Sequence, residues 1–207
     1  MKIKVIGVAI LVLISAIYIT YRPQAAEDTH SNLSDYEVAT FAGGCFWCME
    51  AAFEATAGVV EAVSGYTGGD TVNPTYNQVL TKTTGHLEAV QVYYDPGEVT
   101  FSELLDVYWR NIDPTDDKGQ FVDEGAQYLT AIFYMNEAQR TQAEESKREL
   151  ENSGRFSDPI VTEVIEFDVF YEAEEYHQDY YRKQVLNYKL YSSGSGREQF
   201  QEQHWGE

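Results

Sequence analysis

Apolar residues recur along this 207-residue chain at two spacings, one typical of strands and one typical of helices. Strand-like alternation is present in residues 36–42, 59–65, 87–94, 127–135 and 160–170, and helical spacing in residues 45–57, 75–80, 101–112, 137–152 and 171–184. Strands and helices therefore alternate along the chain. This order predicts an α/β (α+β) two-layer sandwich, in which helices pack against a mixed open sheet with a ferredoxin-like core.

Two segments lack this periodicity. Residues 113–125 contain Pro, Gly and five acidic residues, which predicts a long loop, and long loops in compact domains are often functional. From residue 185 onward the Gly and Ser content predicts an irregular tail. The apolar and aromatic character of Phe200, His204 and Trp205 indicates that the end of this tail packs against the domain.

Residues 1–22 form a different kind of segment, in which Lys2 and Lys4 precede an uncharged apolar run. The run just reaches the lower limit of bilayer-spanning length, and no clear Ala-x-Ala cleavage site follows it. We therefore expect an uncleaved N-terminal membrane anchor, with a cleaved signal peptide as the alternative. The positive-inside rule places the lysines in the cytoplasm and the rest of the chain outside. Residues 23–35 are predicted to be a polar tether, and residues 36–207 the catalytic domain.

The charge balance excludes two classes of partner. The chain has 34 acidic and 14 basic residues, so its formal net charge is −20. This charge repels nucleic acid and anionic lipid headgroups, and neither is an expected partner of the domain. No heptad repeat argues for assembly, so we expect a monomer.

Both cysteines lie within residues 41–50, Phe-Ala-Gly-Gly-Cys-Phe-Trp-Cys-Met-Glu. The two glycines predict a turn between a strand and a helix, which places Cys45 at the helix N-terminus. The unpaired N–H groups and the dipole there favour an anion, so we expect the pKa of Cys45 to be below the free-thiol value of about 8.5. Cys45 is the candidate nucleophile. Cys48 lies on the same helical face and could form a disulfide with oxidised Cys45.

Other interpretations of this pair remain open. A structural disulfide would close a very short loop and stabilise little. A zinc site would need two further ligands, and the four histidines show no paired spacing. A thioredoxin-like dithiol is the main rival, because Cys-x-x-Cys between a strand and a helix is its signature. Here Phe46 and Trp47 separate the cysteines, and these two aromatic residues are candidates to line a pocket for an apolar substrate group.

Glu88 is the candidate general acid. The period-two pattern of residues 87–94 puts Glu88 on the same strand face as Val90, Val92 and Tyr94. A carboxyl group in an apolar row is costly unless it is paired or protonated, and burial raises its pKa. The alternative is a carboxylate at an exposed strand end.

These motifs together resemble the peptide methionine sulfoxide reductases of the A type, over about residues 38–184. The matching motifs are Gly-Cys-Phe-Trp at 44–47, Gly-Tyr-Thr-Gly-Gly at 65–69, Asn-Pro-Thr-Tyr at 73–76, Thr-Gly-His-Leu-Glu-Ala-Val at 84–90, Tyr-Asp-Pro at 94–96 and Tyr-His-Gln at 176–178. The first of these is the most specific. Part of the tail, residues 194–205, is similar to some members as well.

The resemblance implies a role for each matching residue. It makes Cys45 the nucleophile and Glu88 the acid. The substrate-binding residues that it implies are Phe46 and Trp47 for the substrate methyl group, Tyr76 and Tyr128 for the sulfoxide oxygen, and Asp123 in the same pocket. Many members recycle through a cysteine in the C-terminal tail, which has none here, so Cys48 is expected to resolve the oxidised Cys45.

The implied reaction is the reduction of peptidyl and free methionine S-sulfoxide, which repairs oxidised proteins outside the cytoplasm. An external dithiol, thioredoxin or a thioredoxin-like protein, would reduce the Cys45–Cys48 disulfide, and no metal or organic cofactor is expected. The alternative is a membrane-tethered thioredoxin-like thiol-disulfide oxidoreductase. A third interpretation is a surface binding module with one structural disulfide.

Overall fold

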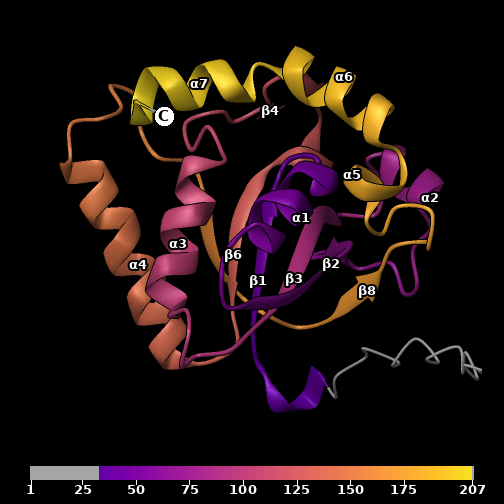
Figure 1. The fold of residues 1–207 in the computed structure, drawn as a ribbon, viewed down its shortest axis with the longest axis horizontal. Helices are drawn as coiled ribbons and strands as arrows, with labels where there is room; N and C mark the ends of the chain where they lie inside the picture. Colours follow the sequence, from indigo (N-terminus) through magenta and orange to yellow (C-terminus); the bar gives the residue numbers. More distant parts are fainter. Residues whose placement is uncertain (1–32, 207) are drawn as a thin grey trace, which may run out of the picture. The chain divides into compact units, whose positions relative to one another are not determined.

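The computed structural model describes residues 33–206, in which strands and helices alternate as the sequence predicts (Figure 1). The strands are β1 (Glu37–Gly43), β2 (Val59–Thr67), β3 (Leu87–Tyr94), β4 (Gly119–Gln120), β5 (Asp123–Glu124), β6 (Thr130–Tyr134), β7 (Glu163–Glu166) and β8 (Phe170–Glu172). The α-helices are α1 (Phe46–Glu54), α2 (Tyr76–Leu80), α3 (Phe101–Arg110), α4 (Glu137–Asn152), α5 (Tyr180–Lys183), α6 (Val185–Ser195) and α7 (Arg197–Trp205). Two 3-10 helices, η1 (Leu33–Asp35) and η2 (Ala126–Tyr128), complete the set.

Six strands form one mixed sheet in the order β7-β6-β1-β3-β2-β8. Strand β1 pairs antiparallel with β3 and β6, β2 pairs antiparallel with β3 and β8, and β6 pairs parallel with β7. The four central strands of the sheet, β6, β1, β3 and β2, together with α1 and α3, follow the βαββαβ order of a ferredoxin-like unit along the chain. The predicted mixed sheet with helices packed against it is confirmed.

The main core lies between the sheet and helices α1, α3 and α4. It contains Phe41 of β1, Phe53 of α1 and Leu104 of α3, each essentially inaccessible to solvent. Phe41 stacks on Phe53 with 5.0 Å between ring centroids. Alternate residues of β3 enter this core, so the sequence correctly assigned the apolar face of the strand that carries Glu88.

The sheet is curled, as the connection between its two edge strands requires. In a flat sheet β7 and β8 would lie about 24 Å apart, at about 4.8 Å per strand. Only residues 167–169 join them, and four residue steps span at most about 14 Å. The face opposite the main core carries small residues on adjacent strands, Ala42, Ala89 and Ala131, which let the two edges approach each other.

The prediction of one alternating strand over residues 160–170 is therefore wrong. The segment forms two short strands on opposite edges of the sheet. The predicted helix over residues 171–184 is also wrong, since its first part is β8 followed by turns and only α5 is helical. Here tertiary contacts override local propensity, because Gln178 uses its side-chain amide to bond both backbone groups of Ser64, at 3.0 and 2.9 Å.

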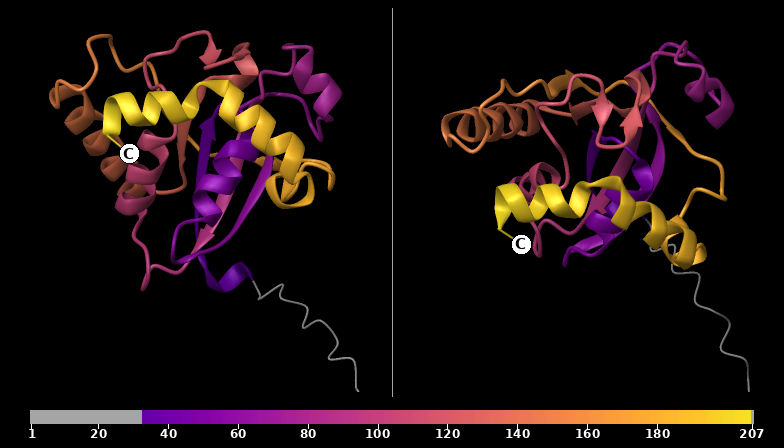
Figure 2. Two further views of the ribbon diagram at one scale, coloured as in Figure 1. Left: turned by 45° about the horizontal axis from the view of Figure 1, so that its top comes forward. Right: turned by 90° about the horizontal axis from the view of Figure 1, so that it is seen from above.

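The predicted irregular tail is helical as well. Glycine and serine are concentrated at residues 192–196, where α6 ends and α7 begins, and Gly196 at the junction has a φ of 92°. Helices α6 and α7 run across the N-terminal end of α1 and the C-terminal end of α3 (Figures 1 and 2). The prediction that the tail packs down is confirmed, because Trp205 packs against the main core.

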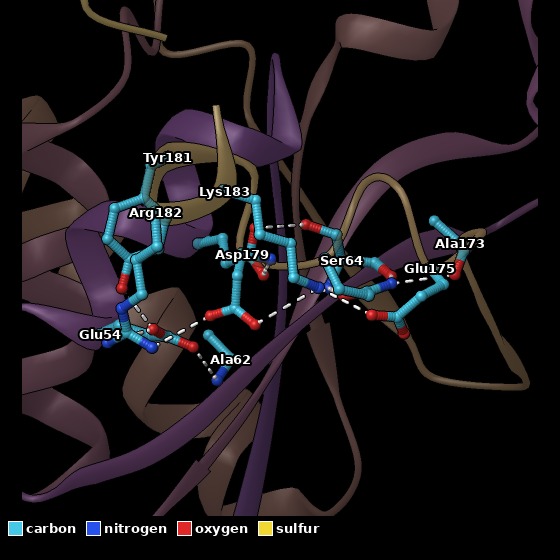
Figure 3. A network of polar contacts seen from close by, with 11 residues as sticks. Glu54, Ala62, Ser64, Ala173, Glu175, Asp179, Tyr181, Arg182 and Lys183 are labelled. Atoms are coloured by element: carbon cyan, nitrogen blue, oxygen red, sulfur yellow. Dashed lines mark hydrogen bonds and ion pairs between the residues drawn. The ribbon is translucent and has the colours of Figure 1, made fainter. Parts of the chain in front are cut away.

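A polar network fixes the turn before α5 to α1 and β2 (Figure 3). Arg182 binds Glu54 at 2.8 Å and Asp179 at 3.0 Å, while Lys183 binds Glu175 at 2.7 Å. The backbone N–H of Asp179 donates to Glu50 at 2.8 Å. These bonds hold the segment that supplies His177 next to α1.

No helix within residues 33–206 has the length and apolar character needed to cross a membrane. The predicted anchor at residues 1–22 lies outside the described residues, as does most of the predicted tether.

Candidate active site

The turn between β1 and α1 presents Cys45 as the residue that caps α1. Gly44 has a φ of 78°, and a Cβ atom on it would come within 2.5 Å of Gln120, so a side chain would be strained there and would collide. The predicted glycine turn and the position of Cys45 at the helix N-terminus are both confirmed. The cysteine side chain accepts no capping hydrogen bond from the helix.

Glu88 accepts a hydrogen bond at the start of α1. Its Oε2 accepts from the backbone N–H of Phe46, the first residue of α1, at 3.1 Å. The Glu88 side chain is 2% exposed, and burial raises its pKa to about 8, against the opposing effect of the bond from Phe46. Glu88 is therefore mostly protonated at neutral pH, which confirms the predicted burial and direction of the pKa shift.

The two thiols are free, buried and mutually hydrogen-bonded. Burial raises the pKa of Cys45, and the neighbouring Cys48 and Glu88 raise it further. The expectation of a lowered pKa for Cys45 is thus wrong for the reduced pair, because burial of the thiol is the largest factor and it raises the pKa. The hydrogen bond with Cys45 lowers the pKa of Cys48 to about 7, despite burial and with help from the positive charge of Arg197.

Phe46 and Trp47 form an aromatic wall beside Cys45. Trp47 stacks on Tyr180 with 3.8 Å between centroids and an interplanar angle of 9°. Its indole Nε1–H donates to Nδ1 of His177 at 3.1 Å. The ring of His177 lies 5.0 Å from that of Phe46. The wall is held in place and leaves an apolar surface next to the sulfur.

Tyr76 and Tyr128 approach the same space from other elements. Tyr76 begins α2, and its backbone N–H donates to Glu174 at 2.9 Å, which fixes the start of that helix. Tyr128 ends η2. Burial raises the pKa of Tyr76 to about 12 and also raises that of Tyr128, and the charge of Glu88 adds to both shifts. Both phenols thus remain protonated donors near Glu88.

Asp123 lies on β5, inside the segment predicted to be a long functional loop. Burial raises the pKa of its carboxyl group, while the hydroxyl of Tyr191 donates to Oδ2 and opposes the shift.

One small pocket brings these residues together. Its lining consists of Cys45, Phe46, Trp47, Tyr76, Glu88, Asp123, Tyr128 and Tyr191. Seven of the eight residues named from the sequence line the pocket. The eighth residue, Cys48, lies in the first turn of α1, three residues after Cys45, and is 4% exposed.

Sequence reasoning missed Tyr191 and the surroundings of the dithiol. Tyr191 and Tyr188 on α6 hydrogen-bond Cys45 and Cys48 respectively. The glycine and serine content of the tail predicts irregular structure and so conceals their signal, although Tyr188 and Tyr191 lie three residues apart, a helical spacing. The signal that could have pointed to His177 is its place in the Tyr-His-Gln motif.

Such a pocket, with a buried thiol pair, a protonated acid, phenols and an aromatic wall, defines a thiol-dependent oxidoreductase site. The sequence pattern of the family described as "Peptide methionine sulfoxide reductase" matches residues 37–207. The chain therefore belongs to this family, and it is an enzyme that reduces methionine sulfoxide in peptides and thereby repairs oxidised proteins.

Individual relatives agree with this membership. "Peptide methionine sulfoxide reductase MsrA" of Bacillus licheniformis is 56% identical over 170 residues, which cover 82% of this chain and 94% of the relative. Among solved structures, Mxr1 from Saccharomyces cerevisiae in reduced form has a TM-score of 0.68 at 30% identity, covering 72% of this chain and 86% of Mxr1.

Two further solved structures are similar. Methionine sulfoxide reductase A of Corynebacterium diphtheriae has a TM-score of 0.65 at 35% identity, and the match covers 72% of this chain and 76% of that one. Mxr1 has also been solved in complex with Trx2, and that chain matches with a TM-score of 0.50 at 25% identity, over 70% of this chain and 84% of Mxr1.

Proposed function

We propose that Cys45 reduces the sulfoxide and that Glu88 supplies the proton. The methyl group of the substrate lies against Phe46 and Trp47, and the sulfoxide oxygen accepts hydrogen bonds from Tyr76 and Tyr128. Glu88 protonates that oxygen as the sulfur of Cys45 attacks the substrate sulfur. The oxygen then passes to the sulfur of Cys45, so the S–O bond of the substrate and the transient S–S bond to Cys45 break while a new S–O bond forms on Cys45. Methionine leaves, and Cys45 is a sulfenic acid.

One observation carries this proposal. A carboxyl group with a pKa of about 8 lines the same pocket as a buried thiol and two phenols. A sulfoxide is a poor electrophile until its oxygen is protonated, so a neutral acid must be available at physiological pH. The proton that Cys45 loses on attack restores Glu88, so the half-reaction needs no other proton source.

Cys48 resolves the sulfenic acid. Its thiolate attacks the sulfur of Cys45, an S–S bond forms, and the hydroxyl group leaves as water after taking up a proton. The mutual hydrogen bond between the two thiols supports this step.

A dithiol protein of the thioredoxin class then reduces the disulfide. The complex of Mxr1 with Trx2 supports this partner for the present chain. The two thiols carry the electrons, so the cycle needs neither a metal nor an organic cofactor.

The test is a stereochemical assay of the full chain. In the presence of dithiothreitol, we expect the enzyme to consume only the S epimer of a racemic methionine sulfoxide peptide. It should also consume the S epimer of free methionine sulfoxide, but more slowly. Chiral chromatography measures the loss of each epimer. Cys45→Ser should lose all activity. Cys48→Ser should release one equivalent of methionine yet fail to cycle with thioredoxin, and full cycling in this variant would contradict the role of Cys48.

The competing function, a thiol-disulfide oxidoreductase for protein disulfides, makes a different prediction. Such an enzyme would reduce insulin disulfides without needing Glu88 or Tyr128. If both sulfoxide epimers survive while insulin is reduced, the roles proposed for Cys45 and Glu88 are wrong.

We also propose that residues 1–22 anchor the enzyme in the cell membrane with the catalytic domain outside the cytoplasm. The charged start and apolar run of this segment support the proposal. Protease treatment of intact cells that express the full chain tests it. The domain should be degraded while a cytoplasmic marker survives, and a protected domain would contradict the orientation.

A further inference from the structure

Arg197 lies beside the dithiol although it is far away in sequence. It is the first residue of α7 and is 5% exposed. Its Nη2 donates to the carbonyl oxygen of Gly43 at 3.2 Å, and its Nη1 contacts Sδ of Met49 at 3.5 Å. Gly43 precedes Cys45 by two residues and Met49 directly follows Cys48. The guanidinium group therefore contacts both flanks of the segment that carries the two thiols.

Among residues 33–206, no carboxylate lies at contact distance from the charge of Arg197. None of the ion pairs within residues 33–206 includes Arg197. Its Nε is buried and has no hydrogen-bond partner in this part of the chain. The group lies over the ring of Phe121 at 4.8 Å. Burial of a cation is costly unless an anion offsets it, so the site favours a negative charge nearby.

Cys48 can supply this negative charge when its thiol loses a proton. The ionisable groups that influence its thiol are Cys45, Arg197, Tyr188 and Asp123, and Glu88 and Tyr191 also interact with it. Arg197 is the one permanent cation in this set. Asp123 is shared with Tyr191 and lines the substrate pocket.

We propose that Arg197 is a positioning residue for the second half of the cycle, in which it holds Cys48 as a thiolate ready to attack the Cys45 sulfenic acid. This inference rests on the resolving role proposed above for Cys48. In the step, the Cys48 thiolate displaces the hydroxyl group from the sulfur of Cys45. An S–S bond replaces the S–O bond, and the hydroxyl leaves as water with a proton from solvent.

The electrostatics of the pair agree with this geometry. The hydrogen bond with Cys45 is the largest factor that lowers the pKa of Cys48, burial opposes it, and Arg197 makes the next favourable contribution. Oxidation of Cys45 to the sulfenic acid changes the hydrogen bond between the two residues. The contribution of Arg197 to the pKa of Cys48 therefore matters most in the sulfenic acid state.

The test separates the two chemical steps in a single turnover. The reduced full chain is mixed with one equivalent of sulfoxide peptide and no reductant, between pH 6 and pH 9. Methionine release reports the first step. Acid quench and mass spectrometry report loss of the sulfenic acid and formation of the disulfide. The variants are Arg197→Met, which removes the charge, and Arg197→Lys, which keeps it.

Arg155→Met is the matched control. Arg155 is exposed, donates to the carbonyl oxygen of His204 and lies 4.0 Å from the centre of the Trp205 ring. Its loss therefore loosens the other end of α7 without removing charge near the dithiol.

We expect Arg197→Met to release methionine at the normal rate but to form the disulfide about fivefold more slowly at pH 6. Without the cation, the pKa of Cys48 should return to the free-thiol value of about 8.5, and such a thiol is scarcely ionised at pH 6. At pH 9 it should be no slower than the wild type, because a more basic thiolate is the stronger nucleophile. Arg197→Lys and Arg155→Met should keep the wild-type pH profile.

A deficit in Arg197→Met that is equal at all pH values, or no deficit, would overturn the proposal in favour of a structural role. Failure of the wild type to release methionine would instead refute the proposed function. Should Arg197→Met not fold, alkylation of Cys48 by iodoacetamide in Cys45→Ala, whose side chain cannot donate a hydrogen bond to Cys48, decides the question. A midpoint clearly below 8.5 supports the proposal, and one at or above 8.5 overturns it.

Discussion

Two buried carboxyl groups, Glu88 on β3 and Glu50 on α1, have nearly the same electrostatic character. They are 2% and 1% exposed, and burial is the main factor that raises each pKa to about 8. Both are therefore mostly protonated at neutral pH. A raised pKa often marks a catalytic acid, yet here it does not distinguish between the two.

Their surroundings distinguish them. Glu88 accepts one backbone hydrogen bond and lines the pocket with Cys45. Glu50 accepts from the backbone N–H of Asp179 at 2.8 Å and from the hydroxyl of Ser64 at 3.2 Å, one bond to each carboxyl oxygen. Glu50 thus joins α1 to β2 and to the turn before α5. Access to a substrate, rather than protonation alone, makes a buried acid catalytic.

Replacing Glu88 should give the largest effect of any change that keeps the thiols. Glu88→Gln preserves the acceptor for the N–H of Phe46 but cannot donate a proton to the sulfoxide. We expect methionine release in a single turnover to slow by about 10²–10⁴-fold, the usual contribution of a general acid. The matched Glu50→Gln variant should stay within about twofold of wild type. Equal losses in the two variants would remove the functional distinction.

The pH dependence sharpens the same contrast. Glu88 acts in its protonated form, so its contribution is present below a pKa of about 8 and is lost above it. The ratio of the wild-type rate to the Glu88→Gln rate should therefore be constant below pH 7 and fall about tenfold per unit above pH 8. Glu88 also raises the pKa of Cys45, so the titration of Cys45 is measured by alkylation in each protein and divided out before the ratio is taken. A ratio that does not change with pH would contradict proton donation by Glu88.

The sequence revealed Glu88 but not Glu50, for a physical reason. In a strand the period of two assigns each residue to a face, so a carboxyl in the apolar row of β3 is visible without a structure. Glu50 lies on a helix that is buried on more than one side, with buried residues at Phe46, Cys48, Met49 and Phe53. No single polar face exists there from which a buried acid would stand out.

Elements that depend on partners far away in the sequence were the other part of the fold that the sequence did not predict. Elements with strong local signals, such as α3 with its capping box at Thr100 and α4 with its cap at Asn136, were predicted nearly to the residue. By contrast, β7 and β8 depend on partners elsewhere in the sheet, and α6 and α7 on the surfaces of α1 and α3. Roles of Tyr191 and Arg197 therefore stayed hidden, because no local pattern places the tail beside the thiols.

Tyr76 and Tyr128 lie near Glu88, whereas the described hydrogen-bond partners of Glu50 are Asp179 and Ser64. Removing one phenol should have an intermediate effect. Tyr128→Phe deletes a proposed donor to the sulfoxide oxygen, and we expect kcat/KM to fall about tenfold, as for the loss of one hydrogen bond of about 1.4 kcal/mol. Tyr108→Phe is the control, because Tyr108 is buried in the core and donates to Ala42 at 2.8 Å. It should lower stability but spare activity. Unchanged activity in Tyr128→Phe would show that its hydroxyl does not contact the substrate.

Glu50 and Glu88 should contribute equally to the pH dependence of the free energy of unfolding. Each folded-state pKa of about 8 exceeds the ordinary value of 4.5, so the stabilisation is complete below about pH 4.5 and is lost as pH rises to about 8. Each acid then lowers the free energy of unfolding by at most about 1.4 kcal/mol per pH unit within this window. Urea unfolding between pH 5 and pH 7.5 should give a shallower decline in Glu50→Gln and in Glu88→Gln alike, by one proton each. A decline unchanged in Glu50→Gln would mean that its pKa is ordinary, and the contrast with Glu88 would then be one of protonation rather than of access.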